Sequence, residues 1–426
     1  MKKIALSAVI IMIISIGIQA ENIDTSADNN LTENLNSPVN ITTIRGVLGG
    51  YDLTEHTKGQ LRAGYITFSK DGTSRTNGYA LAGHTHFDTA RWKGLKLDAE
   101  VYTVLNLGIH QNPLSINGDF FDEDGKSFIL ISQAYLDGKW GNTEIRLGRQ
   151  TLDTPHADAD DIRMMPNYFE AYTITNTDID DLTLRAGLIN KMAGWENAVN
   201  AQQFVNIGET LGTEHIDGIY YTSASYDGIK DLSLNLWCYN YKDIANVIYA
   251  EAGYNYYFTK KTSLTLGLQY DSSQESGAVL LGEQDANTYG VSIELASEEL
   301  GLHILTAYNQ DNGETGAMGL SLGGGPFFTS MEVQTLDAIG GAGSAWIIAA
   351  GYHFEAIGIE ELNVGIAYGN FEAEDHSNYD AKEIDAVIDY AFNKKLSLTA
   401  AYASVTFTHS ATVDYDQFRV ITNYNF

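Results

Sequence analysis

The chain has 426 residues, and its 55 acidic residues outnumber its 25 basic residues, which gives a formal net charge of −30. This balance argues against nucleic-acid binding, because neutralising phosphates needs clustered lysines and arginines and the sequence contains no basic run. The single cysteine, Cys238, rules out a framework of intrachain disulfides.

The chain begins with the pattern of a secretory signal peptide. Lys2 and Lys3 precede an apolar segment, residues 4–18, and Ala20 supplies a small residue before the expected cleavage site. A retained membrane anchor is the alternative, but the apolar segment is shorter than the ~20 residues that a spanning helix needs. Removal of residues 1–20 takes away two lysines and no acid, so the net charge changes from −30 to −32.

The next segment is polar and has no hydrophobic periodicity. Residues 21–45 are therefore expected to form an acidic, disordered leader in the periplasm. The rest of the chain, residues 46–426, shows no linker of changed composition and is expected to form one domain. The sequence leaves residues 41–59 unassigned, as either an additional strand or an inner segment.

From Gln60 onward, apolar and polar residues alternate in segments of roughly ten residues, the length of a membrane-spanning strand. For example, Leu97 and Val101 fall on one face of such a segment, and Asp98 and Glu100 fall on the other. The connections between segments are alternately short and long. This pattern predicts an all-β fold, a transmembrane antiparallel β-barrel of about 18 strands with short turns on the periplasmic side.

The end of the chain separates this barrel from a soluble β-sandwich, in which the apolar faces would be buried. Phe418, Val420, Tyr424 and Phe426 share one face of the last segment, and an aromatic face at a chain end suits lipid better than water. The ending also resembles the signal that the outer-membrane barrel-assembly machinery reads. We therefore expect Tyr424 and Phe426 to serve as the assembly signal.

The third long connection, within residues 148–172, differs from the others in composition. It holds Pro155 and Pro166, two of the five prolines in the chain, together with one histidine, His156. Its charged residues are Asp153, Asp158, Asp160, Asp161 and Arg163. An acidic, proline-bent insert between two barrel strands predicts a loop that folds into the pore and narrows it; an ordinary solvated surface loop is the alternative.

The same stretch resembles the third-loop signature of OprD-type, substrate-specific outer-membrane porins. The matching residues are Gly148-Arg149-Gln150, Pro155, Asp161, Arg163-Met164-Met165-Pro166 and Phe169-Glu170-Ala171, although family members often carry glycine where Ala171 stands. The resemblance implies a barrel whose third and seventh loops fold inward and whose wall arginines face acidic loop groups. It also implies passage of small, often carboxylate-bearing nutrients, with Asp158, Asp160, Asp161 and Arg163 at the constriction.

The wall arginines are predicted from strand alternation and not from the family resemblance. Arg62, Arg146, Arg185 and Arg419 each fall on the polar face of a segment. An arginine on the lipid face would cost ~2–4 kcal/mol near the membrane midplane, so these side chains are expected to line the pore. Charged rings of this kind set selectivity in pores. The alternative is that they only pair with neighbouring acids such as Glu144.

Other chemistry-bearing residues favour no separate site. His84 and His86 share a strand face, but without further ligands they are expected to be pore-lining residues. The acidic segment 119–125 is expected to be solvated or bridged to lipopolysaccharide by divalent ions. The sequence contains no catalytic, cofactor-binding or metal-binding motif, so no enzyme activity is expected.

Two functions remain open at the level of sequence. The favoured one is an outer-membrane channel for passive diffusion of small water-soluble nutrients and ions, with carboxylate-bearing or zwitterionic solutes preferred. The alternative is a barrel that acts as a surface scaffold, adhesin or embedded hydrolase with little transport. The expected partners are outer-membrane lipid, lipopolysaccharide, the assembly machinery and small solutes, and the protein is expected to be a monomer or homotrimer.

Overall fold

The computed structural model describes residues 57–109, 116–122, 124–197, 199–313, 320–375, 379–408 and 413–426. The expected signal peptide and acidic leader lie outside the described residues. Of the stretch that the sequence left unassigned, only residues 57–59 are described, and they open the first strand. No helix in these described ranges is long and apolar enough to cross a membrane.

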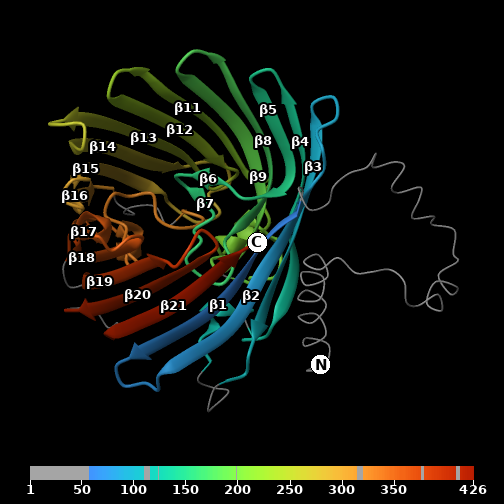
Figure 1. The fold of residues 1–426 in the computed structure, drawn as a ribbon. Coiled ribbons are helices and arrows are strands. Elements are labelled where there is room, and N and C mark those ends of the chain that lie inside the picture. The colour runs from blue at the N-terminus through green and yellow to red at the C-terminus, as the bar shows by residue number, and fades with distance from the viewer. Residues whose placement is uncertain are drawn as a thin grey trace, which may run out of the picture. The chain divides into compact units, whose positions relative to one another are not determined.

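Within the described ranges, eighteen antiparallel strands close into a barrel (Figure 1). The last strand pairs with the first in an unbroken register from Gln60↔Asn425 to Lys70↔Tyr415, which closes the sheet. The predicted fold class and the predicted number of strands are confirmed. The barrel strands are β1 (Thr57–Lys70), β2 (Thr76–Asp88), β3 (Leu95–Asn106), β4 (Phe128–Trp140), β5 (Thr143–Gln150), β8 (Tyr168–Ile179), β9 (Leu182–Ala193), β11 (Ile219–Ile229), β12 (Leu232–Tyr241), β13 (Ala245–Tyr257), β14 (Thr262–Glu275), β15 (Asp285–Ser297), β16 (Leu302–Asp311), β17 (Gly343–His353), β18 (Leu362–Ala373), β19 (Asp380–Ala391), β20 (Leu396–Phe407) and β21 (Tyr415–Asn425).

Alternation along each strand separates a lipid-facing surface from the lumen. In β3, Leu97 and Val101 point outward and are exposed, whereas Asp98, Glu100 and Tyr102 point inward and are buried. Successive strand residues face opposite sides, so a register shift of one residue would place the acids in lipid. The apolar–polar alternation of the sequence therefore fixes which face of the sheet is the outside.

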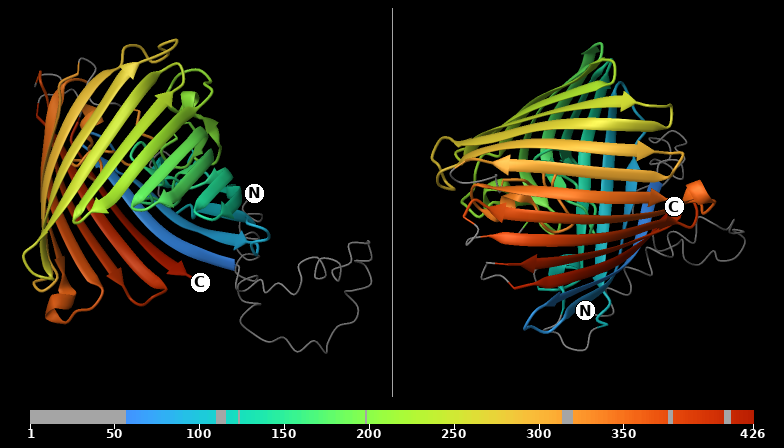
Figure 2. Two further views of the ribbon diagram at one scale, coloured as in Figure 1. Left: turned by 90° about the horizontal axis from the view of Figure 1, so that it is seen from above. Right: turned by 90° about the vertical axis from the view of Figure 1, so that its left-hand side faces the viewer.

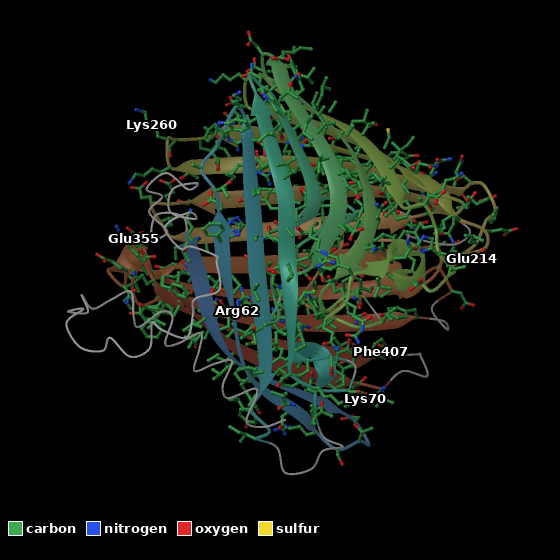
Figure 3. The ribbon with its side chains drawn as sticks, turned by 90° about the vertical axis from the view of Figure 1, so that its right-hand side faces the viewer. Arg62, Lys70, Glu214, Lys260, Glu355 and Phe407 are labelled. Atoms are coloured by element: carbon green, nitrogen blue, oxygen red, sulfur yellow. The ribbon has the colours of Figure 1, made fainter. Side chains whose placement is uncertain are left out.

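The two ends of the barrel differ in the length of their connections. Figure 3 shows Lys260, which lies in the short connection between β13 and β14, at one end, and Glu214, which lies in the long connection between β9 and β11, at the other. The side views in Figure 2 show the strands inclined to the barrel axis. Outer-membrane barrels have short turns in the periplasm and long loops outside, which orients this barrel.

Short elements lie in the connections. The pair β6 (Asp153–Thr154) and β7 (Ala157–Asp158) forms a small separate sheet, and β10 (Val205–Asn206) pairs antiparallel with the end of β9. The helical turns are η2 (Gly118–Phe120), α3 (Ile207–Thr210), η3 (Leu336–Ile339) and η4 (Phe354–Ile357).

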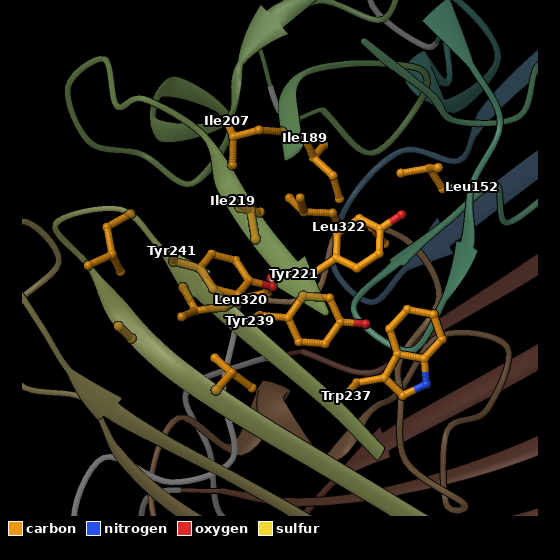
Figure 4. Packing of buried hydrophobic residues seen from close by; sticks show 14 of the residues in the cluster. Leu152, Ile189, Ile207, Ile219, Tyr221, Trp237, Tyr239, Tyr241, Leu320 and Leu322 are labelled. Carbon is orange, nitrogen blue, oxygen red and sulfur yellow. Dashed lines mark hydrogen bonds between the residues drawn. The ribbon is translucent and has the colours of Figure 1, made fainter. Parts of the chain in front are cut away.

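Two connections fold into the lumen and contribute to its apolar core. They are the third loop (residues 151–167) and the seventh loop (residues 312–342, described at 312–313 and 320–342). Leu152 and Ala157 of the third loop pack with Leu320 and Leu322 of the seventh loop in one buried cluster (Figure 4). Figure 1 shows β6 and β7 within the ring of strands. The predicted inward fold of the third loop is confirmed, and the seventh loop also folds inward, as the resemblance implied.

Candidate functional site

The third loop is bound to one side of the barrel through Arg62 of β1. Its Nη1 and Nη2 atoms donate to the two carboxylate oxygens of Asp161, each at 2.5 Å, and Nη1 also donates to the Arg163 carbonyl at 2.9 Å. Tyr102 of β3 donates to the Met164 carbonyl at 2.8 Å. Only 5% of Arg62 is exposed, and three of its hydrogen bonds go to the third loop, so this guanidinium holds the loop against the wall.

The opposite side of the third loop is bound to β14. His156 Nε2 lies 2.6 Å from Asp271 Oδ2, and both side chains are completely buried. Backbone hydrogen bonds connect the same part of the loop to the seventh loop: Leu322 N donates to the His156 carbonyl and Asp158 N donates to the Leu322 carbonyl. The third loop therefore crosses the lumen from β1 to β14.

Arg163 is a third buried attachment of this loop. Its Nη2 donates to Gln417 of β21 at 3.2 Å, its guanidinium lies 4.4 Å from the Trp195 ring centroid, and Asp119 lies 3.7 Å from its Nε. Burial and the neighbouring charge of Arg419 lower the pKa of Arg163 below its usual value. Burial on this scale leaves Arg163 little contact with the pore water.

The seventh loop lies against the strands near the end of the chain. Arg419 of β21 forms an ion pair with Glu332 at 2.5 Å. Two wall acids accept hydrogen bonds from loop backbone N–H groups. Glu383 of β19 accepts from Val333 and Gln334, and Asp385, two residues further on, accepts from Glu332. The seventh loop thus covers β19 and β21. The polar side chains of the wall there, Arg419, Glu383 and Asp385, attach the loop.

A cavity of about 760 Å³ remains between the third loop and the strands β5, β8, β9, β11 and β12. The charged side chains around it come from two sources. The loop contributes Asp153, Asp158, Asp160 and Asp161, and the wall contributes Glu144, Arg146 and Arg185. The wall also contributes Thr173, Thr175, Tyr221 and Trp237. The cavity thus has an acidic loop face and a wall face that carries two arginines.

The two wall arginines lie on either side of β8. Arg146 of β5 is opposite Thr173, and Arg185 of β9 is opposite Thr175. Arg146 is neutralised by Glu144 at 2.7 Å and by Asp137 at 3.6 Å.

Arg185 has a different environment. Its Nη1 donates to the Ser225 hydroxyl at 3.0 Å, and its guanidinium lies 5.8 Å from the Trp237 ring centroid. In the part of the chain that the structure describes, no carboxylate forms an ion pair with Arg185. Its charge therefore remains available to an anionic group in the cavity.

Burial shifts the acid–base equilibria of the loop acids. It raises the pKa of Asp158, and it raises the pKa of Asp160 to about 6. It also raises the pKa of Glu196, which accepts a hydrogen bond from Asn167 at the end of the third loop, to about 7. The charge of the loop face therefore changes within the physiological pH range.

Aromatic side chains of β11 and β12 form part of the cavity wall (Figure 4). Trp237 stacks on Tyr239 with ring centroids 5.9 Å apart and an interplanar angle of 9°, and Tyr221 packs beside both rings. Sequence alternation places Trp237 on the polar face of its strand, but it does not show that β11 and β12 face the third loop. That placement requires the barrel register.

The structure divides the predicted site residues into two groups. Asp158, Asp160, Asp161, Arg146 and Arg185 lie around the cavity. Arg62, Arg163 and Arg419 are buried, and each attaches an inward-folded loop to the wall. All four predicted wall arginines point inward.

The last strand has the orientation that the sequence predicted. Tyr424 is opposite Leu61 of β1 and faces outward, where it is exposed. Phe426 N donates to the Gly59 carbonyl at 3.0 Å. A Cβ atom on Gly59 would lie 2.1 Å from the Phe426 ring, so the absence of a side chain at residue 59 makes room for this ring.

His84 and His86 belong to the inner wall formed by β2 and β3. His86 Nε2 lies 3.3 Å from Asp98, and His84 Nε2 lies 3.8 Å from Glu100. Glu100 also accepts a hydrogen bond from Tyr168 at 2.8 Å. In the described ranges, no group of three or more histidine, cysteine or acidic side chains is arranged to hold a metal ion.

The sequence model of a protein family described as "outer membrane porin, OprD family" matches residues 122–426, which is more than half of the chain. No curated protein matches the sequence.

Three solved structures show the same fold. OccAB3 of Acinetobacter baumannii has 13% identity and a TM-score of 0.75, with 87% of this chain and 98% of that chain covered. OccK9 (OpdG) of Pseudomonas aeruginosa has 20% identity and a TM-score of 0.75, with 87% and 97% covered. The P. aeruginosa outer membrane protein OpdK has 18% identity and a TM-score of 0.73, with 87% and 99% covered.

Proposed function

The chain belongs to the OprD family of outer-membrane porins, and we propose that carboxylate-bearing or zwitterionic solutes pass through the cavity between its third loop and Arg185. The protein is an outer-membrane channel for small solutes. The observation that carries the finer proposal is the arrangement of charge. Arg185 has only neutral partners in the described structure, and the loop opposite it is acidic.

Arg185 would bind the carboxylate of a passing solute. A guanidinium forms charge-assisted hydrogen bonds to a carboxylate, and its planar fork can make two of them at once. A zwitterion would also present an ammonium group to the loop acids. Binding at such a point must be weak enough to allow exit, and the partial occupation of Arg185 by Ser225 and Trp237 would limit its strength.

For simple salts we propose a modest cation preference. The acids around the cavity are Glu144, Asp153, Asp158, Asp160 and Asp161, and they outnumber Arg146 and Arg185. Charges on the outer loops are screened beyond about 8 Å at physiological ionic strength, so the charges at the narrow passage should dominate. The carboxylate preference and the cation preference are compatible, because the first reflects one local binding group and the second reflects the total field.

Uptake by proteoliposomes tests the proposal with solutes of matched size. The panel is a short monocarboxylate, its neutral amide, the corresponding amine and an α-amino acid. We expect the carboxylate and the amino acid to enter faster than the amide, and we expect Arg185→Ala to remove this advantage. Equal rates for carboxylate and amide in the wild-type protein would contradict the proposed preference. Failure to conduct ions in planar bilayers would instead favour the scaffold or adhesin function.

We also propose that the barrel-assembly machinery reads the last strand. Tyr424 and Phe426 present an outward aromatic row at the seam between β21 and β1. These residues make no contact with the cavity between the third loop and the wall, so their role would be confined to assembly.

A further inference from the structure

Three charged residues interrupt the apolar outer surface of the barrel. They are Arg149 of β5, Glu170 of β8 and Lys191 of β9, and each is directly opposite its neighbour in the sheet. Glu170 lies between the two cations, 4.0 Å from Arg149 and 3.4 Å from Lys191. One carboxylate therefore balances two positive charges, and the group has a net charge of +1 in a protein that is otherwise strongly acidic.

Strand alternation shows that this group faces away from the lumen. Gln150, which follows Arg149, is buried on the inner side, and Phe169 and Ala171, on either side of Glu170, are completely buried. Met192, next to Lys191, is also completely buried. The side chains of Arg149 and Lys191 remain 35% and 40% exposed.

The group lies at a defined depth in the membrane. Arg149, Glu170 and Lys191 are each within three residues of the strand end that leads into a long outer loop. Toward the middle of the membrane, the outward positions next to them are the exposed apolar residues Leu147 and Tyr172. The cations therefore lie at the level of the outer headgroups, directly beyond a surface that contacts acyl chains.

Arg149 is also held in place before any ligand binds. Its Nη1 donates to the Ile131 carbonyl at 3.2 Å, and its guanidinium lies 4.3 Å from the Phe204 ring centroid. These contacts reduce the conformational freedom that the side chain would lose on binding an anion. They leave donors of the guanidinium for an external acceptor, since Arg carries five N–H groups.

We propose that Arg149 and Lys191 bind a phosphate group of lipopolysaccharide in the outer leaflet, with the acyl chains of that lipid lying over Leu147 and Tyr172. A phosphate monoester suits two adjacent cations because it carries up to two negative charges and several acceptor oxygens. The inference is independent of the transported solute, because the group lies on the outer surface and not in the lumen.

An ion-pair network that serves only the barrel's own stability is the competing explanation. Partly exposed pairs at 3.4 and 4.0 Å contribute little to stability, and such a network would gain most from equal numbers of acids and bases. The two explanations make opposite predictions for Glu170. If the group only stabilises the barrel, removal of Glu170 weakens the network. If the two cations bind a phosphate, removal of Glu170 increases the positive charge that the phosphate meets.

Lipid binding to the purified, detergent-solubilised protein tests the proposal. Native mass spectrometry would measure retention of bis-phosphorylated lipid A, with enzymatically dephosphorylated lipid A and phosphatidylglycerol as comparison lipids. We expect the double variant Arg149→Gln/Lys191→Gln to bind the bis-phosphorylated lipid about tenfold more weakly, because two charge-assisted hydrogen bonds are lost. We expect Glu170→Gln to bind it more tightly than the wild type.

Lys382→Gln is the matched control, because Lys382 is a single exposed, outward lysine at the outer end of β19. Heat-dependent migration on gels shows that each variant is a folded barrel. Four results would overturn the proposal: no loss of binding in the double variant, an equal loss in the Lys382 control, equal binding of dephosphorylated lipid A, or weaker binding by Glu170→Gln. A change in oligomeric state without a change in lipid binding would show that the group contacts a second copy of the chain instead.

Discussion

The side chain of Asp161 both contacts the barrel wall and borders the cavity. Its two oxygens accept from Arg62, yet the residue also borders the cavity. Loss of its charge would leave the buried Arg62 guanidinium without its anionic partner, which is costly even where the lost ion pair is weak. Asp161 therefore couples the position of the loop to the charge around the cavity.

We expect Asp161→Asn to destabilise the packed loop by about 1–3 kcal/mol, a range reduced for the partial exposure of Asp161. Limited proteolysis should then cut the third loop faster, and single-channel current should become noisier. Asp153→Asn is the control, because it removes the same charge from an exposed position in the same loop. Equal proteolysis rates for both variants would show that the Arg62–Asp161 pair does not hold the loop.

Asp160 and Glu196 are expected to make the channel sensitive to pH. Burial raises the pKa of Asp160 to about 6 and that of Glu196 to about 7, so both groups hold a proton at a pH where free carboxyls have lost it. Loop packing is then favoured at low pH and weakens as the pH rises from about 4, the ordinary carboxyl pKa, to about 7. The same ionisation adds negative charge beside the passage.

Reversal potentials should therefore show a cation preference that increases from about pH 5 to pH 8. In Asp160→Asn, this increase should be smaller, because the variant group cannot ionise. Asp153→Asn should lower the cation preference at every pH but leave its pH dependence intact. A pH profile that is flat in the wild-type protein would contradict the assignment.

Sequence alternation predicted the orientation of the wall arginines but not their partners. Orientation depends only on neighbouring residues along one strand, so Arg62, Arg146, Arg185 and Arg419 could be placed without a structure. The pairing of Arg62 with Asp161 joins residues 99 positions apart, and that of Arg419 with Glu332 depends on the path of the seventh loop. Only those contacts show which arginines hold a loop and which are free to bind a solute.

The third loop is the element that narrows the lumen. It crosses between Arg62 and Asp271 and packs on the seventh loop through Leu322. Replacing residues 154–163 with a short glycine linker should raise single-channel conductance, because this segment is the part that fills the lumen. Removal of the exposed turn 71–75 between β1 and β2 is the matched control and should leave conductance unchanged. Unchanged conductance in the 154–163 variant would mean that ions take another path.

The end of β21 is the element on which barrel closure is expected to depend. Phe426 covers Gly59 at the seam and exchanges backbone hydrogen bonds with it. We expect Phe426→Ala to lower the amount of folded protein in the outer membrane several-fold without changing the selectivity of the channels that do form. Phe418→Ala, in the same outward row but opposite Thr67, should have a smaller effect. Normal protein levels with altered selectivity would contradict this role.

At the level of elements, the sequence predicted more of the barrel than of its contents. Strands such as β3 and β14 alternate strictly because one face meets lipid and the other meets water, so their number and direction are readable. The acids and prolines of residues 151–167 indicated an inward loop. Its route across the lumen could not be read, because it depends on side-chain contacts with β1, β14 and the seventh loop.

At the largest scale, the described part of the chain is a closed barrel whose lumen is largely occupied by its own loops. The seventh loop covers β19 and β21 through Glu383, Asp385 and Arg419. The third loop leaves the cavity beside β5, β8, β9, β11 and β12. Most of the protein's negative charge lies away from this cavity, so selectivity is expected to depend on a few residues and not on the net charge of −30.

The most direct test of this account is to block the proposed passage with a covalent label. In a Cys238→Ser background, which removes the one native thiol, Thr175→Cys places a thiol on the wall between Glu144 and Arg185. Ala367→Cys places one on the inner wall beneath Met331 of the seventh loop.

Reaction with a bulky, charged methanethiosulfonate should remove most of the single-channel current at Thr175→Cys and little of it at Ala367→Cys. A loss of current at Ala367→Cys with none at Thr175→Cys would show that solutes do not pass between the third loop and Arg185.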